Sequence, residues 1–394
     1  MRLVERLAPV MSSLPANVTV LGCGMGGLAA STLLSELLGN RGTLTVVEPR
    51  AKIPFPPAFE WLTFGWREPN KIQRDLKKLG KRRNVRMVSE KVERIDVKGR
   101  SIRTQSQEMH YDRLVVSLGA ELAVDDVPGL DVYSHFFYSL DGAMKLRDAI
   151  EEFKGGTIVV GVCRTPFKCP AAPYELSLLL EEHMRRAGKK AEVRLFTPEP
   201  HPVPAAGSVI GKQVERLLSS RGVKYLPKMK PSRIDKDKVV FEDGSEQSYD
   251  LLVTIPPHRP AKVVVDAGLA EASGWVPVNP QTLATKFEDV FAIGDVASIE
   301  TPHGHVPFLP KAGVFAQGQA EVVANNIAVS ITGKGQTRQW DGTGSCHLQV
   351  SKSASAFLKG TFLSNPPRLE FHPASRKWYL DKIRRERDWL DQRL

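Results

Sequence analysis

Cysteine is scarce in this 394-residue chain, which has four, too few to make a disulfide-rich scaffold. No apolar run approaches the ~20 residues that a membrane-spanning helix requires. Residues 1–16 place charged side chains among short apolar pieces, so we expect no secretory signal either. With 42% hydrophobic and 25% charged residues, the composition is that of a globular protein with room for two or three domains.

Nucleic-acid-binding motifs are also missing. The formal net charge is +11, yet the chain has no zinc-finger spacing, no RNP-like aromatic motif and no extended basic block. The basic run from Lys77 to Arg83 is typical of a solvated helix end and loop. His303, His305 and the Cys346-His347 pair lack the spacing of a metal site, so we expect no metal. The charge leaves an acidic partner, anionic lipid or an unspecific basic surface open.

Glycine is present where a first dinucleotide loop needs it. A β-branched run, a glycine motif, an Ala/Leu-rich helix, a second strand and an acid follow one another: Asn17–Val20, Gly22-x-Gly24-x-x-Gly27, a helix to about Leu38, Thr43–Val47 and Glu48. This order predicts a strand–turn–helix–strand unit that binds a dinucleotide. A carboxylate at Glu48 would accept hydrogen bonds from ribose hydroxyls and repel a ribose 2′-phosphate.

The corresponding second segment has lost the glycine motif and keeps one glycine, Gly161. The segment Thr157–Glu175 reads T-I-V-V-G-V-C-R-T-P-F-K-C-P-A-A-P-Y-E. Its three prolines remove backbone donors that a pyrophosphate would need, and Arg164 and Phe167 add bulk. The second loop therefore argues against NAD(P)H as an electron donor, and it places Cys169 where that nucleotide would lie.

The chain repeats a pattern, which predicts an α/β protein with two Rossmann-like domains. Tyr111–Ala120 resembles Tyr249–Pro257, and each follows an alternating stretch with turns, as expected of a hairpin excursion and a returning strand. We predict one discontinuous domain over 17–120 and 245–332, a second over 121–244, and a small C-terminal region over 333–394.

Two later segments carry candidate cofactor contacts. The strand ending in Gly294-Asp295 would place a carboxylate on the ribityl or pyrophosphate region of a cofactor; an ordinary turn is the alternative. Lys311 precedes a predicted helix from Val314 to about Ser330, and a cation at that point would stabilise an anionic ring. A plain surface lysine is the alternative there.

Taken together, the glycine motif, Glu48, the Leu118-Gly119-Ala120 strand end and Gly294-Asp295 resemble the glutathione-reductase-like flavoproteins, over residues 17 to 330. Cys169-Pro-Ala-Ala-Pro-Tyr-Glu175 resembles the active-site segment of sulfide:quinone oxidoreductases and of flavocytochrome c sulfide dehydrogenases. Gly342-Thr-Gly-Ser-Cys346 is similar to the segment that carries their partner cysteine. Phe55–Arg67 is similar to a loop of the quinone-reducing branch. Residues 50–70 lack the flavin-attaching cysteine of the flavocytochromes, and Glu121–Tyr138 lacks the third cysteine of many sulfide:quinone oxidoreductases.

The resemblance implies FAD as cofactor, sulfide or a related sulfur species as donor, and quinone as acceptor. The implied FAD-binding residues are Gly22, Gly24, Gly27, Glu48, Gly119, Gly294, Asp295 and Lys311. Cys169 and Cys346 would form a redox pair beside FAD, with Glu175 handling a proton. Two alternatives remain open: electron transfer to a partner redox protein, and an FAD-binding module without turnover. We expect Cys23 and Cys163 to be buried hydrophobes.

The C-terminal segment from Lys377 to Leu390 predicts a basic helix with aromatic residues. Tyr379, Ile383, Leu390 and Leu394 fall near one face, and tryptophans beside basic residues suit a membrane interface. This favours peripheral association with the cytoplasmic face of a membrane. Docking of the helix on its own domain, or on a second subunit of a homo-oligomer, is the alternative.

Overall fold

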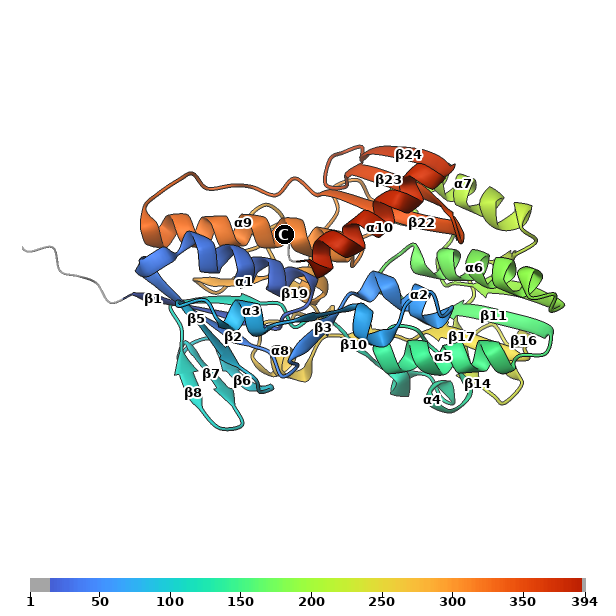
Figure 1. Cartoon of the computed structure of the whole chain (residues 1–394), viewed down its shortest axis with the longest axis horizontal. Helices are drawn as coiled ribbons and strands as arrows, with labels where there is room; N and C mark the ends of the chain where they lie inside the picture. The colour runs from blue at the N-terminus through green and yellow to red at the C-terminus, as the bar shows by residue number, and fades with distance from the viewer. Residues whose placement is uncertain (1–14, 392–394) are drawn as a thin grey trace, which may run out of the picture.

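A parallel five-stranded sheet forms the first unit of the computed structural model, which describes residues 15–391 (Figure 1). Its strands lie in the order β20 (Val290–Ala292), β9 (Arg113–Val116), β1 (Ala16–Leu21), β2 (Gly42–Val47) and β5 (Val85–Val88). Residues 18–21 are buried, as expected of a central parallel strand covered on both faces. The predicted strand–glycine–helix–strand order is confirmed.

Two helices pack together over this sheet. The first, α1 (Met25–Leu37), begins directly after the glycine motif, and α9 (Gly313–Thr332) returns from the far end of the chain to lie against it (Figure 1). Small residues on α1 allow this close approach: a Cβ on Gly26 would lie 3.1 Å from the carbonyl oxygen of Ala316. The helix pair therefore holds the N-terminal loop and the Gly294-Asp295 segment in one body.

A second parallel sheet repeats the plan. Its order is β13 (Lys224–Leu226), β12 (Ala191–Phe196), β11 (Gly156–Val162) and β17 (Leu251–Ile255), with α6 (Ala172–Arg186) following β11. The predicted return to the first domain at 245 is wrong, because β16 (Glu246–Ser248) and β17 pair with strands of the second unit. The chain rejoins the first sheet only at β20.

The internal repeat includes a small antiparallel sheet that precedes the returning strand of each unit, β9 or β17. Before β9 the chain makes a three-stranded antiparallel sheet of β6 (Val92–Asp96), β7 (Ser101–Thr104) and β8 (Glu108–His110). Before β17 it makes another, of β14 (Pro231–Ile234), β15 (Lys238–Phe241) and β16. Both returning strands enter their sheets in parallel, so the fold is α/β with two Rossmann-like units, as predicted.

The terminal region is an antiparallel sheet covered by a helix. Strands β22 (Thr343–Ser351), β23 (Ala354–Thr361) and β24 (Arg368–Ser375) carry α10 (Arg376–Leu390), seen in red in Figure 1. Trp378 stacks on Phe357 with ring centroids 4.3 Å apart, and Trp389 is buried against Phe55. The helix thus docks on its own chain, the alternative to a membrane-facing helix; Leu394 lies outside the described residues.

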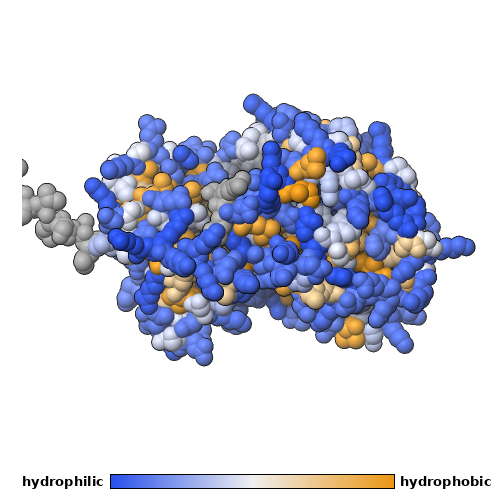
Figure 2. All heavy atoms as spheres, in the orientation of Figure 1, coloured by the Kyte–Doolittle hydropathy of each residue, from blue (hydrophilic) through white to orange (hydrophobic). Residues whose placement is uncertain are grey.

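The outer surface gives no broad apolar face in the view of Figure 2, where hydrophilic residues dominate and hydrophobic groups are scattered. Leu380 is the exposed large hydrophobe of α10, with 52% of its surface accessible. Within residues 15–391, no helix combines the length and the apolar character needed to cross a bilayer.

Candidate active site

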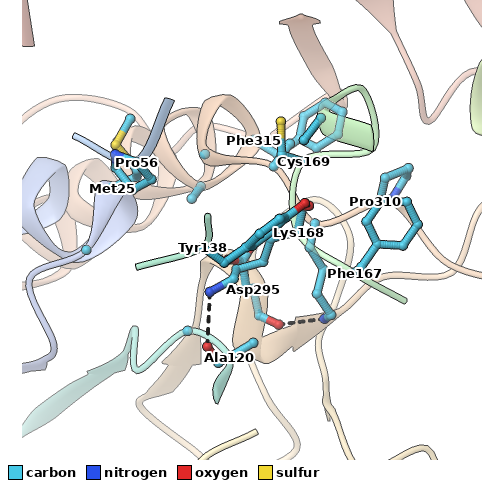
Figure 3. A pocket seen from close by; sticks show the side chains of 18 of the residues that line it. Met25, Pro56, Ala120, Tyr138, Phe167, Lys168, Cys169, Asp295, Pro310 and Phe315 are labelled. Atoms are coloured by element: carbon cyan, nitrogen blue, oxygen red, sulfur yellow. Dashed lines mark hydrogen bonds between the residues drawn. The ribbon is translucent and has the colours of Figure 1, made fainter. Parts of the chain in front are cut away.

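A cavity of about 1840 Å³ lies where the two units and the terminal sheet meet. The glycine loop, the end of β9, the loop after β11, the start of α9, β22 and α10 all contribute to its lining. Figure 3 shows Met25 and Pro56 on one side of it and Cys169, Lys168 and Tyr138 toward the other. Segments far apart in the chain therefore share one site.

The glycine loop is shaped for close approach of a ligand. Gly22 has a φ of +86°, and a Cβ on Gly27 would lie 1.9 Å from the carbonyl oxygen of Gly22. A Cβ on Gly24 would meet no atom within 4 Å, so this position opens onto the cavity. Such a loop at a helix N-terminus suits a pyrophosphate.

Glu48 lies at the end of β2 and is hydrogen-bonded to the glycine loop; its predicted contact with a ribose stays a prediction. Its Oε2 accepts a hydrogen bond of 2.8 Å from the backbone N–H of Cys23, and its Oε1 accepts one of 2.7 Å from Nε of Arg50. Burial alone would raise the pKa of Glu48, but the Arg50 hydrogen bonds and charge outweigh it and hold the pKa below its usual value. Glu48 is therefore ionised and can accept hydrogen bonds from a ribose.

Asp295 and Lys311 also line the cavity, at the β20 side. Burial raises the pKa of Asp295, while the charges of Lys168 and Lys311 counter that rise. The ammonium of Lys311 donates to the backbone oxygens of Asp295 and Ala297 and lies 3.4 Å from the ring centroid of Trp275. Burial lowers its pKa to about 8. The proposed contact of Lys311 with a cofactor ring stays a prediction.

Lys168 is a cavity lysine that sequence reasoning missed, although it directly precedes Cys169. The ammonium of Lys168 donates to the backbone oxygen of Ala120 at 3.3 Å (Figure 3). The hydroxyl of Tyr138 donates to the carbonyl oxygen of Lys168 at 2.8 Å. Burial lowers the pKa of Lys168, and the nearby Asp295 opposes that shift. The cavity therefore holds two lysines around one carboxylate.

The residues of this wall fit FAD. The glycine loop admits a pyrophosphate, Glu48 can receive a ribose, and the Asp295 carboxylate, for which no hydrogen-bond donor is found among the described residues, faces the same cavity. Gly119 and Gly294 adopt positive φ values of 68° and 75°, which keep side chains out of this path. The individual contacts remain predictions.

The second loop is filled by its own side chains. Arg164 donates to the carbonyl oxygens of Cys163 and Pro231, each at 2.8 Å, and Phe167 is buried. The backbone N–H of Cys169 is taken by the carbonyl of Lys311 at 2.8 Å. Its prolines carry no N–H, so this loop offers fewer backbone donors to a phosphate than a glycine-rich loop would.

Cys169 and Cys346 meet in this cavity. Cys169 has a φ of 56° in the second loop, and Cys346 lies on β22, opposite Leu358 of β23. Both are free thiols. The thiol of Cys346 is the largest influence on Cys169 and, together with burial, raises its pKa well above the usual value. The fold thus brings the predicted pair together; its redox role stays a prediction.

A buried charge cluster adjoins the pair. Lys382 of α10 donates to Glu175, in the first turn of α6, and its Nζ lies 3.7 Å from Oε2 of Glu60. Oε1 of Gln349 accepts from Lys382 at 3.2 Å and from the Trp61 indole N–H at 2.7 Å. Sequence reasoning found Glu175 but missed its partners, because Lys382 is 207 residues away and carries no local signal.

The two remaining cysteines are core residues. Cys23 and Cys163 are fully buried, and burial raises the pKa of each to about 12, which confirms that they are core residues. His303 and His305 stack with ring centroids 4.7 Å apart. Among the described residues, no cluster of three or more ligating side chains could hold a metal ion.

Comparison with known proteins places this geometry in a family. The sulfide-quinone reductase of Aquifex aeolicus is 27% identical over 336 residues, covering 80% of this chain and 76% of that protein. The mitochondrial sulfide:quinone oxidoreductase of Mus musculus is 25% identical, covering 89% and 79%. The type II NADH:quinone oxidoreductase of Staphylococcus haemolyticus is 24% identical, covering 82% and 84%.

The fold has a solved counterpart in the sulfide:quinone oxidoreductase of Aquifex aeolicus, with a TM-score of 0.86 at 24% identity over 95% of this chain and 90% of that one. The family model for pyridine nucleotide-disulphide oxidoreductases matches residues 16–320. This family typically binds FAD. The chain is therefore a flavoprotein oxidoreductase that belongs to the pyridine nucleotide-disulphide oxidoreductase family.

Proposed function

We propose that this protein oxidises sulfide through Cys169 and Cys346 and passes the electrons through FAD to a quinone. The observation that carries the proposal is the meeting of these two thiols in the cavity whose other wall fits FAD. Relatives named for sulfide and quinone support the same substrates. The second loop has lost backbone donors to its prolines, and the N–H of Cys169 is bonded to Lys311, which supports sulfide over NADH as the donor.

The cysteine pair would cycle between a disulfide and two thiols. Hydrosulfide attacks one sulfur of the disulfide, which forms a persulfide and, with one proton, releases the other cysteine as a thiol. A second hydrosulfide takes the outer sulfur of the persulfide and leaves as hydrodisulfide, so that both cysteines are thiols. FAD, held by the glycine loop and Glu48, would supply the two-electron acceptor for re-forming the disulfide, with quinone as the final acceptor. The net change is the transfer of two electrons and two protons to quinone.

The environment favours the thiol form of Cys169 at the end of this cycle. Besides Cys346 and burial, the charge of Glu175 raises the pKa of Cys169, and Lys382 opposes that shift. When Cys169 is the leaving group it therefore takes up a proton, which an acidic group beside it can supply. Quinone would be bound at the membrane surface, and the docked α10 makes the cavity wall that it would approach.

Anaerobic mixing with sulfide tests the proposal in Cys169→Ser and Cys346→Ser. We expect each variant to keep FAD and to lose flavin reduction by sulfide at least about a thousand-fold, because neither can form the disulfide. Cys163→Ala is the matched control, since Cys163 lies on the same loop but is buried away from the cavity lining. Wild-type rates in both serine variants would contradict the proposal.

A further inference from the structure

Glu60, which the sulfide-oxidation chemistry above does not use, is a carboxyl group buried beside Glu175. Glu60 is 5% exposed and Glu175 is 3% exposed, and both line the cavity that holds the cysteine pair. One cation, Lys382, which is 7% exposed, serves both. Two ionised carboxylates with one ammonium would leave an uncompensated buried charge, which is costly. A single retained proton removes that charge.

Lys382 contacts the two carboxyl groups unequally. Lys382 is bound to Glu175 directly, whereas its Nζ is 3.7 Å from Glu60, beyond a normal hydrogen bond. Gln349 and the indole of Trp61, whose ring centroid lies 5.0 Å from Nζ of Lys382, fix the ammonium from the other sides. Glu175 is thus the better-compensated anion, and the proton resides mainly on Glu60.

The electrostatics agree with this order. Burial first, and then the charge of Glu175, raise the pKa of Glu60 well above its usual value, while Lys382 opposes the shift. A negative charge on Cys169 also raises the pKa of Glu60, so the carboxyl cluster and the cysteine pair interact electrostatically. The protonation of Glu60 therefore depends on the charge of its neighbour Glu175.

The other titratable groups around the cluster are neutral or already paired. Burial lowers the pKa of His347 to about 4, and burial raises the pKa of Tyr138 well above its usual value, so both are neutral at pH 7. Asp381 accepts from His347 at 3.0 Å and from Arg385 at 3.1 Å. None of these groups therefore adds the second positive charge that two ionised carboxylates, Glu60 and Glu175, would need.

We propose that Glu60 and Glu175 share one proton, held in place by Lys382, and that this pair is the acid that protonates the leaving cysteine when hydrosulfide opens the disulfide. Hydrosulfide brings one negative charge. The S–S bond breaks, a new S–S bond forms to the incoming sulfur, and the shared proton moves to the leaving sulfur. The negative charge then rests on the two carboxylates beside Lys382, and the thiol stays neutral.

This inference rests on the proposed function for its catalytic half, whereas the shared proton itself is independent of any substrate. Infrared difference spectra of the FAD-loaded wild type minus each variant, near neutral pH, should show a protonated carboxyl band that shifts in D₂O. Burial also raises the pKa of Glu199 to about 7, but its contribution is common to all the proteins and cancels in the difference. Both Glu60→Gln and Glu175→Gln should lose this band, because removing either partner leaves the other ionised beside Lys382. Persistence of the band in Glu60→Gln would overturn the shared proton.

Kinetics test the catalytic half. Near neutral pH, flavin reduction by sulfide in Glu60→Gln should slow by about ten-fold or more, as expected for the loss of a positioned acid. The wild-type rate should fall at high pH as the pair loses its proton, and Glu60→Gln should lack this limb. Equal pH profiles in the two proteins would contradict the acid role.

The matched control is Glu386→Gln, which alters a buried carboxylate of α10 outside the cluster. Glu386 accepts from Arg67 at 2.7 Å and is not part of the cavity lining. It should keep both the carboxyl band and the pH profile. If sulfide reduces none of the proteins, the proposed function fails, and the infrared result alone still decides whether the proton is shared.

Discussion

At the scale of single residues, the nucleotide loop depends on glycines, because they have no side chain. Gly22 and Gly27 approach backbone atoms so closely that a side chain would displace the turn, whereas Gly24 opens onto empty space. Glu48 then fixes the end of the second strand through Cys23 and Arg50. The three glycines therefore serve two purposes, packing of the loop and access for the ligand.

Alanine substitutions separate these purposes. Gly27→Ala should lower the free energy of unfolding by at least about 2 kcal/mol, because its Cβ would overlap the carbonyl oxygen of Gly22. Gly24→Ala should stay within about 0.5 kcal/mol of wild type and weaken FAD binding, because its methyl group enters the ligand path. Chemical unfolding of the apoproteins and FAD fluorescence titration give the two quantities. Equal stability loss in both variants would contradict this division.

Residues with local signals were predictable and residues without them were not. The glycine loop, Glu48 and the buried Cys163 followed from patterns within a few dozen residues of sequence. The Cys169–Cys346 pair was expected only through the resemblance, because spacing alone cannot join residues from different units. The Glu60–Lys382 contact joins α2 (Phe59–Thr63) to α10 from distant parts of the chain, so no local pattern predicts it.

At the scale of elements, the position of α10 in the structure differs from the membrane-facing position that its sequence favours. Its aromatic and basic residues are typical of a membrane-interface helix, yet Trp389 packs under Phe55 and its carbonyl accepts from Arg74 at 3.2 Å. Arg67 and Glu386 add a buried ion pair to the same joint. The helix is therefore a wall of the cavity, and deleting it would remove Lys382 as well as any membrane contact.

Point substitutions on α10 test this docking better than truncation. Trp389→Ala should cost roughly 3–5 kcal/mol of unfolding free energy, as large buried aromatics do. Leu380→Ala, at the exposed position, should change it by no more than about 0.5 kcal/mol. Liposome flotation of Leu380→Ala then reports membrane association without disturbing the cavity. Similar stabilities of the two variants would refute the docked helix.

At the scale of the whole molecule, the buried joint between the terminal sheet and α10 makes stability sensitive to acid. His347 of β22 contacts Asp381 of α10, but burial and the charges of Arg385 and Lys382 lower its pKa from 6.5 to about 4. The unfolded chain binds a proton at His347 first, so folding loses stability as the pH falls from about 6.5 to about 4. Above pH 6.5 this loss is absent.

His347→Gln should therefore flatten the acid limb of the stability curve. The wild type should lose up to about 3 kcal/mol between these pH values through this residue, and the variant should not. Urea unfolding at a series of pH values measures the difference. An unchanged slope in His347→Gln would show that the histidine titrates alike in folded and unfolded chains.

Under the proposed function, the same architecture selects the electron donor for the molecule as a whole. The first unit keeps an open nucleotide loop, while the second fills its loop with Arg164 and Phe167 and presents Cys169 to the shared cavity. One comparison tests this claim most directly: anaerobic mixing of the FAD-loaded protein with sulfide and, separately, with NADH, while the flavin absorbance is recorded. We predict bleaching by sulfide, recovery on adding a soluble quinone, and no bleaching by NADH. Bleaching by NADH with none by sulfide would contradict the account.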